Sequence, residues 1–128
     1  MKILVIDDEY EILELLKIKL SAKKHQVYTA SCGEEGIVMA GKFKPDLILL
    51  DVVMPGMDGV EVCGKLKASR KTKGIPVFML SAMSQVYYID EAFKQGADDY
   101  ILKPFKAAGL NDTIQEKFEL YWKKNKKN

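Results

Sequence analysis

The chain has 128 residues, of which 48% are hydrophobic and 30% charged, and its formal net charge is +2. That length suits one domain with its own hydrophobic core, and the composition is that of a soluble globular protein. Because no apolar run is long enough for a transmembrane helix and the first residues do not resemble a signal peptide, we expect a cytoplasmic protein with no membrane partner.

Short apolar runs alternate with segments whose apolar residues recur at steps of three and four. The runs predict strands at residues 2–6, 26–30, 46–50, 75–80 and 99–102. The segments between them predict helices at residues 10–24, 33–42, 59–69 and 85–95, and a last helix that begins late, near Asn111. We expect Val38 and Phe93 on the inward sides of their helices. Five strands alternating with five helices predict an α/β domain, (βα)5, with a doubly wound parallel five-stranded sheet.

Residues 47–59, LILLDVVMPGMDG, form the most informative stretch of the chain. Four aliphatic residues lead directly into Asp51, and turn-forming Pro-Gly and Asp-Gly pairs follow. This pattern is typical of a strand buried on both faces, with Asp51 at its carboxyl end, where open α/β sheets bind their ligands. Asp51 could instead cap the next helix, but Asp58 lies closer to that helix start and suits the role better.

Three other predicted strands also end in a polar or charged side chain. Asp7 and Asp8 follow the first strand, Ser81 the fourth and Lys103 the fifth. Because the carboxyl ends of parallel strands share one edge of the sheet, we expect these groups to converge on Asp51. Taken singly, the acids and the serine suit helix caps and the lysine suits the surface, but their joint placement favours a shared site.

Carboxylates gathered at neutral pH repel one another, and a hard divalent cation such as Mg²⁺ relieves that repulsion. An ammonium and a hydroxyl beside the cation can hold further anionic oxygens. Metal, lysine, hydroxyl and one carboxylate together suit phosphoryl transfer to the carboxylate. The two cysteines, Cys32 and Cys63, lack metal-ligand spacing, and we expect them to be reduced packing residues.

Four motifs carry a family resemblance: LVIDDE, LILLDVVMPGMDG, MLSA and ADDYILKPF. In this combination and order the chain resembles the receiver domain of two-component response regulators, of the stand-alone chemotaxis-regulator type, over residues 1–122. The resemblance implies a flavodoxin-like fold with strand order 2-1-3-4-5. It also implies phosphorelay signalling, in which Asp51 accepts a phosphoryl group from a phosphohistidine on a sensor histidine kinase or a phosphotransfer protein.

The resemblance assigns metal binding to the acids. Asp8, Asp51 and the main-chain carbonyl of Val53 would bind Mg²⁺, with Mn²⁺ as a substitute, and Asp7 would act through a water molecule. No organic cofactor is expected.

The remaining polar groups receive switching roles from the same resemblance. Lys103 would pair with a phosphoryl oxygen, and its bond to Pro104 would be cis. Ser81 would hydrogen-bond the phosphoryl group and move inward, while Tyr100 would turn from solvent to the interior. A downstream protein target would bind the face made by the fourth helix, fifth strand and fifth helix. The protein is then a signalling receiver that catalyses its own phosphorylation, not an enzyme.

Two apolar residues bear on the lifetime of the phosphorylated state. Val53 lies two residues after Asp51, and Met83 lies two after Ser81. In the family these positions flank the path of the hydrolytic water, and neither side chain here can orient water by hydrogen bonding. We therefore expect slow self-dephosphorylation.

The last six residues, 123–128, contain four lysines and no acid, and without them the formal net charge falls from +2 to −2. This segment could be the start of a linker, a nucleic-acid contact or a solvated tail. We favour a disordered basic tail, because lysines without interleaved aromatic residues make a poor binding site, and we expect no nucleic-acid partner for this domain alone. The chain is either a single-domain regulator or a piece of a longer protein.

Three rival interpretations are weighed against the receiver. A haloacid-dehalogenase-like phosphatase needs a second aspartate two residues after the nucleophile, where this chain has Val53. A flavodoxin-like flavin binder needs a Ser/Thr/Gly phosphate loop after the first strand, where this chain has two aspartates and a glutamate. An interaction module of receiver fold that is never phosphorylated would be expected to lose one of the acceptor-site groups, and none is missing here.

Overall fold

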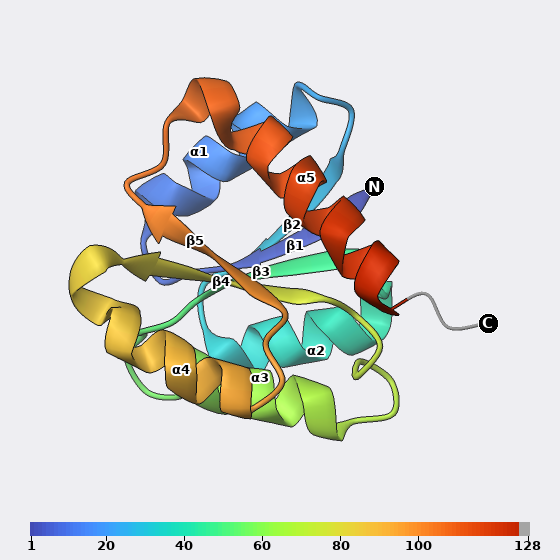
Figure 1. The fold of residues 1–128 in the computed structure, drawn as a ribbon, viewed down its shortest axis with the longest axis vertical. Coiled ribbons are helices and arrows are strands. Elements are labelled where there is room, and N and C mark those ends of the chain that lie inside the picture. Colours follow the sequence, from blue (N-terminus) through green and yellow to red (C-terminus); the bar gives the residue numbers. More distant parts are fainter. Residues whose placement is uncertain (126–128) are drawn as a thin grey trace.

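Five parallel strands form a single sheet in the order β2-β1-β3-β4-β5 in the computed structural model, which describes residues 1–125 (Figure 1). This order and the alternation of strands with helices confirm the predicted doubly wound α/β fold. The strands are β1 (Lys2–Ile6), β2 (Gln26–Ala30), β3 (Leu47–Asp51), β4 (Val77–Ala82) and β5 (Asp99–Lys103). The helices are α1 (Tyr10–Ser21), α2 (Gly33–Phe43), α3 (Gly59–Ala68), α4 (Val86–Lys94) and α5 (Ala107–Asn125), with a short 3-10 helix over Met83–Gln85 before α4.

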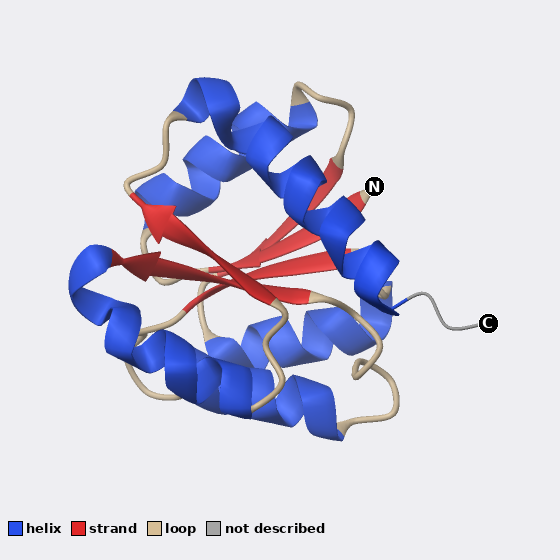
Figure 2. Ribbon diagram, in the orientation of Figure 1, coloured by secondary structure: helices blue, strands red, loops and turns tan. Residues whose placement is uncertain are grey.

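Helices cover both faces of the sheet, with α1 and α5 on one side and α2, α3 and α4 on the other (Figures 1 and 2). Successive side chains of β1 alternate between the two cores: Ile3 and Val5 pack toward α1 and α5, and Leu4 and Ile6 pack toward α2 and α3. Since both faces are covered, the central strands are almost wholly apolar. Among residues 1–125, no helix combines the length and apolar character needed to cross a bilayer.

The register of the sheet brings the strand ends to one edge. Leu50 of β3 pairs with Ile6 of β1, so Asp51 lies beside the residue that follows β1. On the other side Asp51 pairs with Leu80 of β4, and Ala82 pairs with Lys103 of β5. Residues that are far apart in the sequence therefore meet at the carboxyl edge of the sheet.

Several boundaries differ from those expected from the sequence. Helix α1 ends at Ser21, not at residue 24, because Lys24 adopts a left-handed backbone conformation with φ of 69°. Strand β4 begins at Val77, not at residue 75, because Pro76 has no N–H to donate to a neighbouring strand.

Helix α5 differs from the expectation at both ends. It begins at Ala107 and not near Asn111, and it continues to Asn125. The predicted disordered tail is therefore wrong for residues 123–125, which are helical, and residues 126–128 lie outside the described part of the chain. The side-chain Nδ2 of Asn125 donates to the carbonyl of Tyr121 at 2.8 Å and supports this last turn.

Two side chains that were expected to face inward are exposed. Val38 is 68% exposed, because α2 approaches the sheet through Gly33, Gly36 and Ala40, on another side of the helix. Phe93 of α4 is 42% exposed and sits at the border of the core. Helical spacing alone does not distinguish such a border position from a buried one.

The two cysteines are free thiols, as expected. Cys63 is buried in the core between α3 and α4, and burial raises the pKa of its thiol to about 11. A thiol with so high a pKa stays protonated and unreactive at neutral pH, which agrees with a packing role.

Candidate functional site

Three carboxylates meet at the carboxyl edge of the sheet. Asp7 follows β1 and is fully buried, Asp51 ends β3 and is 4% exposed, and Asp8 is exposed to solvent. One oxygen from each of the three lies within 4.8 Å of the others. The convergence predicted from the strand ends is confirmed for the acids.

Lys103 extends from the end of β5 into this acidic group. Its Nζ lies 2.9 Å from Oδ2 of Asp7, 3.3 Å from Oδ1 of Asp51 and 3.4 Å from Oε1 of Glu9. The lysine side chain is 13% exposed, so its ion pairs with the buried Asp7 and Asp51 are shielded from bulk water, whereas Glu9 is exposed. The Lys103-Pro104 peptide bond is cis, as the resemblance implied.

The site carries an excess of negative charge, because the single ammonium of Lys103 lies among several carboxylates. Burial and the neighbouring charge of Asp7 raise the pKa of Asp51 to about 7, although Lys103 opposes this. Burial also raises the pKa of Asp7, against hydrogen bonds from the Glu9 amide and from Lys103. For Lys103, burial lowers the pKa, but its bonds and attraction to Asp7 and Asp51 outweigh burial and raise it. The ammonium therefore stays charged, and the carboxylates remain only partly compensated.

The helix-capping alternatives are not realised for the strand-end residues. Asp58 caps α3 by accepting the amide of Glu61 at 2.9 Å, as predicted. Asp7 accepts the amide of Glu9, the residue before α1, at 2.9 Å. Ser81 donates its hydroxyl to the carbonyl of Ala82 at 2.9 Å and caps no helix.

A hollow of about 340 Å³ opens beside Asp51, and we call it the acidic pocket. Its walls come from the loops that follow β1, β3 and β4 and from the end of β5. A phosphoryl-sized group fits in this volume next to the Asp51 carboxylate. The lining residues are Asp8, Glu9, Asp51, Val53, Ala82, Gln85 and Lys103.

Gly59 allows the loop after β3 to fold back against Asp51. A Cβ atom at this position would overlap the carbonyl oxygen of Asp51 and come within 2.8 Å of the Cα of Val52. The Gly59 amide donates to the carbonyl of Val52 at 3.1 Å, which fixes the path of the chain between Asp51 and α3. Only a residue without a side chain fits here.

The donors around Asp51 fit a hard divalent cation. Carboxylate oxygens from Asp7, Asp8 and Asp51 converge, and Val53, whose carbonyl was expected to be a ligand, lines the same pocket. Oxygen donors with excess negative charge are the set that Mg²⁺ prefers. Burial raises the pKa of Asp51 most and the neighbouring charge of Asp7 raises it further, and a bound cation would relieve that repulsion.

Tyr100 is partly exposed at the surface of β5. Its ring contacts Phe93 edge-to-face, with 6.4 Å between the ring centroids, and the Nζ of Lys117 lies 5.4 Å from the Tyr100 centroid. Tyr100 pairs in register with Met79, so it lies on the same face of the sheet as Ser81, two residues further along β4. The tyrosine is 37% exposed and therefore lies at the surface.

The sequence matches the family described as the response regulator receiver domain over residues 3–115. The chain belongs to this family of receiver domains. Receiver domains act in two-component phosphorelay signalling and bind Mg²⁺ at an acidic pocket, and the three aspartates of this chain form a cluster compatible with such a site. Because the chain belongs to the receiver domain family, the phosphatase and flavin-binding interpretations are excluded.

Curated relatives and solved structures agree with this assignment. The chain is 41% identical over 114 residues to the alkaline phosphatase synthesis transcriptional regulatory protein PhoP of Bacillus subtilis, a match covering 89% of the chain and 47% of that relative. It is 41% identical over 104 residues to the DNA-binding dual master transcriptional regulator RpaA of Synechocystis, covering 81% of the chain and 43% of RpaA. The chain thus spans about half the length of the curated relatives it matches.

Among solved structures, chemotaxis protein CheY4 of Vibrio cholerae matches with a TM-score of 0.84 and 30% identity, over 90% of this chain and 96% of that one. A CheY-like receiver domain protein of Methanospirillum hungatei matches with a TM-score of 0.85 and 28% identity, over 97% and 98% of the two chains. The receiver fold is therefore shared with solved chains of similar length.

Three residues that line the pocket, Glu9, Ala82 and Gln85, were not predicted from the sequence. Glu9 joins the ion pairs of Lys103, and Gln85 accepts the amide of Ala82 at 3.0 Å. The acidic run that contains Glu9 was visible as a signal, whereas nothing in the local sequence marks Gln85 as a pocket residue. Its placement depends on the turn between β4 and α4.

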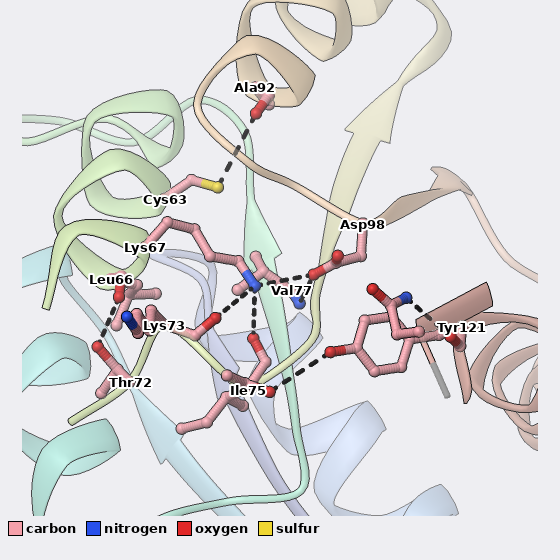
Figure 3. A network of polar contacts seen from close by, with 12 residues as sticks. Cys63, Leu66, Lys67, Thr72, Lys73, Ile75, Val77, Ala92, Asp98 and Tyr121 are labelled. Carbon is pink, nitrogen blue, oxygen red and sulfur yellow. Dashed lines mark hydrogen bonds and ion pairs between the residues drawn. The ribbon is translucent and has the colours of Figure 1, made fainter. Parts of the chain in front are cut away.

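A second polar cluster lies at the opposite edge of the sheet (Figure 3). The Nζ of Lys67 donates to Oδ2 of Asp98 at 3.0 Å and to the carbonyls of Ile75 at 2.8 Å and Lys73 at 3.3 Å. The same Asp98 oxygen accepts the amide of Val77 at 2.9 Å. This cluster ties the end of α3 to the beginnings of β4 and β5, far from the acidic pocket.

Proposed function

We propose that Asp51 is the phosphoryl acceptor of this receiver domain, with a phosphohistidine of a sensor histidine kinase or a phosphotransfer protein as donor. The observation that carries the proposal is the position of Asp51: it lies in the acidic pocket with Asp8 beside it and Lys103 Nζ 3.3 Å from its Oδ1. A buried carboxylate with an adjacent ammonium and a nearby cation site is equipped to receive an anionic group.

The transfer is a displacement at phosphorus. An oxygen of Asp51 bonds to phosphorus while the bond between phosphorus and the histidine nitrogen breaks, and the electron pair leaves with the imidazole, which takes up a proton. Asp51 must be ionised to attack, and with its pKa raised to about 7 only part of the carboxyl is ionised at neutral pH when no cation is bound.

Asp8, Asp51 and the main-chain carbonyl of Val53 would hold Mg²⁺, with Asp7 acting through a water molecule. When bound, the cation neutralises the acids and withdraws charge from the phosphoryl oxygens. Lys103 is then the residue that pairs with a phosphoryl oxygen, moving away from Asp7, which it contacts at 2.9 Å.

Phosphorylation would be transmitted through Ser81 and Tyr100. The Ser81 hydroxyl leaves the Ala82 carbonyl, which it contacts at 2.9 Å, and donates to the new phosphoryl group. Tyr100 then turns inward, leaving Phe93 and Lys117. This rearrangement changes the face formed by α4, β5 and α5, where exposed aromatic residues support the binding of a downstream protein target.

Incubation with acetyl phosphate and Mg²⁺, followed by intact mass measurement, tests the proposal. The wild-type protein should gain one phosphoryl group, and Asp51→Asn should gain none. Asp58→Asn is the matched control, because Asp58 caps α3 outside the acid cluster, and this variant should be labelled like the wild type. Absence of labelling in the wild type would favour a receiver-fold module that binds partners without phosphorylation.

A further inference from the structure

The backbone amide of Ala82 is a hydrogen-bond donor at the rim of the acidic pocket. It is already engaged, because its N–H donates to the side-chain Oε1 of Gln85 at 3.0 Å. Both residues line the pocket beside Asp51. The amide and its acceptor therefore stand where a group attached to Asp51 would come to lie.

The sheet explains why this amide faces Asp51. The N–H and C=O of one strand residue point to the same side, and the side alternates along the strand. The carbonyl of Leu80 accepts the amide of Val52 at 3.0 Å, so Leu80 is directed toward β3. Ala82 lies two residues further along β4 and is directed the same way. Strand β3 ends at Asp51, so the hydrogen bonds between β3 and β4 do not extend to the Ala82 amide. The side chain of Gln85 accepts a hydrogen bond from this amide instead.

Two donors that line the pocket, and the buried hydroxyl of Ser81 on the same strand, thus already have acceptors within the chain. Lys103 contacts Asp7, Asp51 and Glu9, the Ser81 hydroxyl donates to the Ala82 carbonyl, and the Ala82 amide donates to Gln85. A phosphoryl group brings three strong acceptor oxygens and must compete for these donors. Among the side chains that hold these donors, Gln85 is the one that is not an acid.

We propose that Gln85 is a positioning residue that holds the Ala82 amide until a phosphoryl oxygen displaces it. The proposal rests on phosphorylation at Asp51. Breaking the Gln85 bond opposes phosphoryl uptake, so this one side chain sets how readily the pocket accepts the group. Once displaced, Gln85 no longer ties the 3-10 turn of Met83–Gln85 to β4, and the start of α4 is released.

Substitution at position 85 separates this role from simple helix capping. Gln85→Met keeps the length of the side chain and removes the acceptor, whereas Gln85→Glu keeps an acceptor and adds negative charge. Gln95→Met, at the other end of α4, is the matched control. Each protein is incubated with a series of acetyl phosphate concentrations and Mg²⁺, and the labelled fraction is followed by intact mass. Hydrogen exchange of the Ala82 amide is measured in the unlabelled proteins.

The two substitutions should have different effects on phosphoryl uptake. Gln85→Met should lower the half-saturating acetyl phosphate concentration by roughly threefold to tenfold, the range of one hydrogen bond, and should speed exchange of the Ala82 amide. Gln85→Glu should be labelled no faster than the wild type. If Gln85 only capped the helix, Gln85→Met would have the same half-saturating acetyl phosphate concentration as the wild type or a higher one. That result would overturn the proposal. Equal gains in both variants would also overturn it, whereas an unlabelled wild type would overturn phosphorylation at Asp51 as well.

Discussion

The Nζ of Lys103 lies closer to Asp7, at 2.9 Å, than to the proposed acceptor Asp51, at 3.3 Å. The ammonium is therefore held most tightly by the fully buried acid, which has no other cation beside it among the described residues. This arrangement keeps the acceptor carboxylate only partly neutralised. The stability of the pocket and its affinity for a divalent cation should both depend on this lysine.

Replacing Lys103 with methionine should destabilise the protein by about 3 kcal/mol without Mg²⁺, because buried carboxylates lose their partner. The loss should be smaller with Mg²⁺, since the cation takes over the neutralisation. Urea unfolding with and without the ion measures both values. Lys94→Met is the control: its ion pair with Glu91 is exposed, and its loss should stay below about 0.5 kcal/mol. Equal losses in both conditions would mean that the cation does not bind among these acids.

The raised pKa of Asp51 predicts an unusual pH dependence for the protein without divalent cations. The folded state holds the Asp51 proton up to about pH 7, whereas the unfolded carboxyl releases it near its ordinary pKa of 3.8. The folded state therefore binds more protons across this window, and the contribution of Asp51 to stability falls as the pH rises through it. Asp7, whose pKa is also raised, acts in the same direction.

Asp51→Asn removes this contribution and should be more stable than the wild type above pH 7. Each pKa unit corresponds to about 1.4 kcal/mol, so the gain should reach a few kcal/mol at pH 8 and shrink toward pH 5. Urea unfolding in EDTA at several pH values gives the difference between the two proteins. A difference that stays constant between pH 5 and 8 would contradict the electrostatic explanation.

Gly59→Ala should be strongly destabilising, because the added methyl group meets backbone atoms of Asp51 and Val52 that cannot move aside cheaply. We expect a loss of about 2 kcal/mol or more in thermal or urea unfolding, together with slower phosphoryl uptake at the displaced Asp51. Gly109→Ala in α5 is the control, since a Cβ there meets no atom within 4 Å. That variant should be neutral or slightly more stable, as alanine favours helix.

Val53→Asn or Val53→Glu should shorten the lifetime of the phosphorylated protein. Val53 lines the acidic pocket and cannot orient an attacking water, whereas an amide or carboxylate can. Loss of the phosphoryl group is followed by intact mass after removal of acetyl phosphate. Val38→Asn, at an exposed valine of α2, should leave the rate unchanged. Unchanged lifetimes in both Val53 variants would argue against slow self-dephosphorylation set by this side chain.

The sequence predicted the features that depend on short-range pattern and on the geometry of parallel sheets. The apolar runs identified the five strands, and the shared edge of a parallel sheet placed Asp7, Asp51 and Lys103 together. Asp58 was recognisable as a cap because capping involves residues only three apart.

Features that depend on tertiary approach were not predictable in the same way. The exposure of Val38 follows from small residues on another side of α2, which let that side approach the sheet. The bond from Ala82 to Gln85 exists because β3 stops one residue too early to reach that amide. Both outcomes depend on where neighbouring elements lie, and a single chain read in order does not give those positions.

The ion pair of Lys67 with Asp98 limits which single substitutions the chain can accept at these two positions. Lys67 is 15% exposed and Asp98 20%, so losing either partner leaves a poorly solvated charge and breaks bonds that close the loop before β4. Replacing both together by apolar residues avoids the unpaired charge that a single replacement leaves, and the remaining cost is the loss of the backbone bonds to Ile75 and Val77. Descendants of this chain should therefore keep the two residues or exchange them jointly, with few lineages passing through the half-changed state.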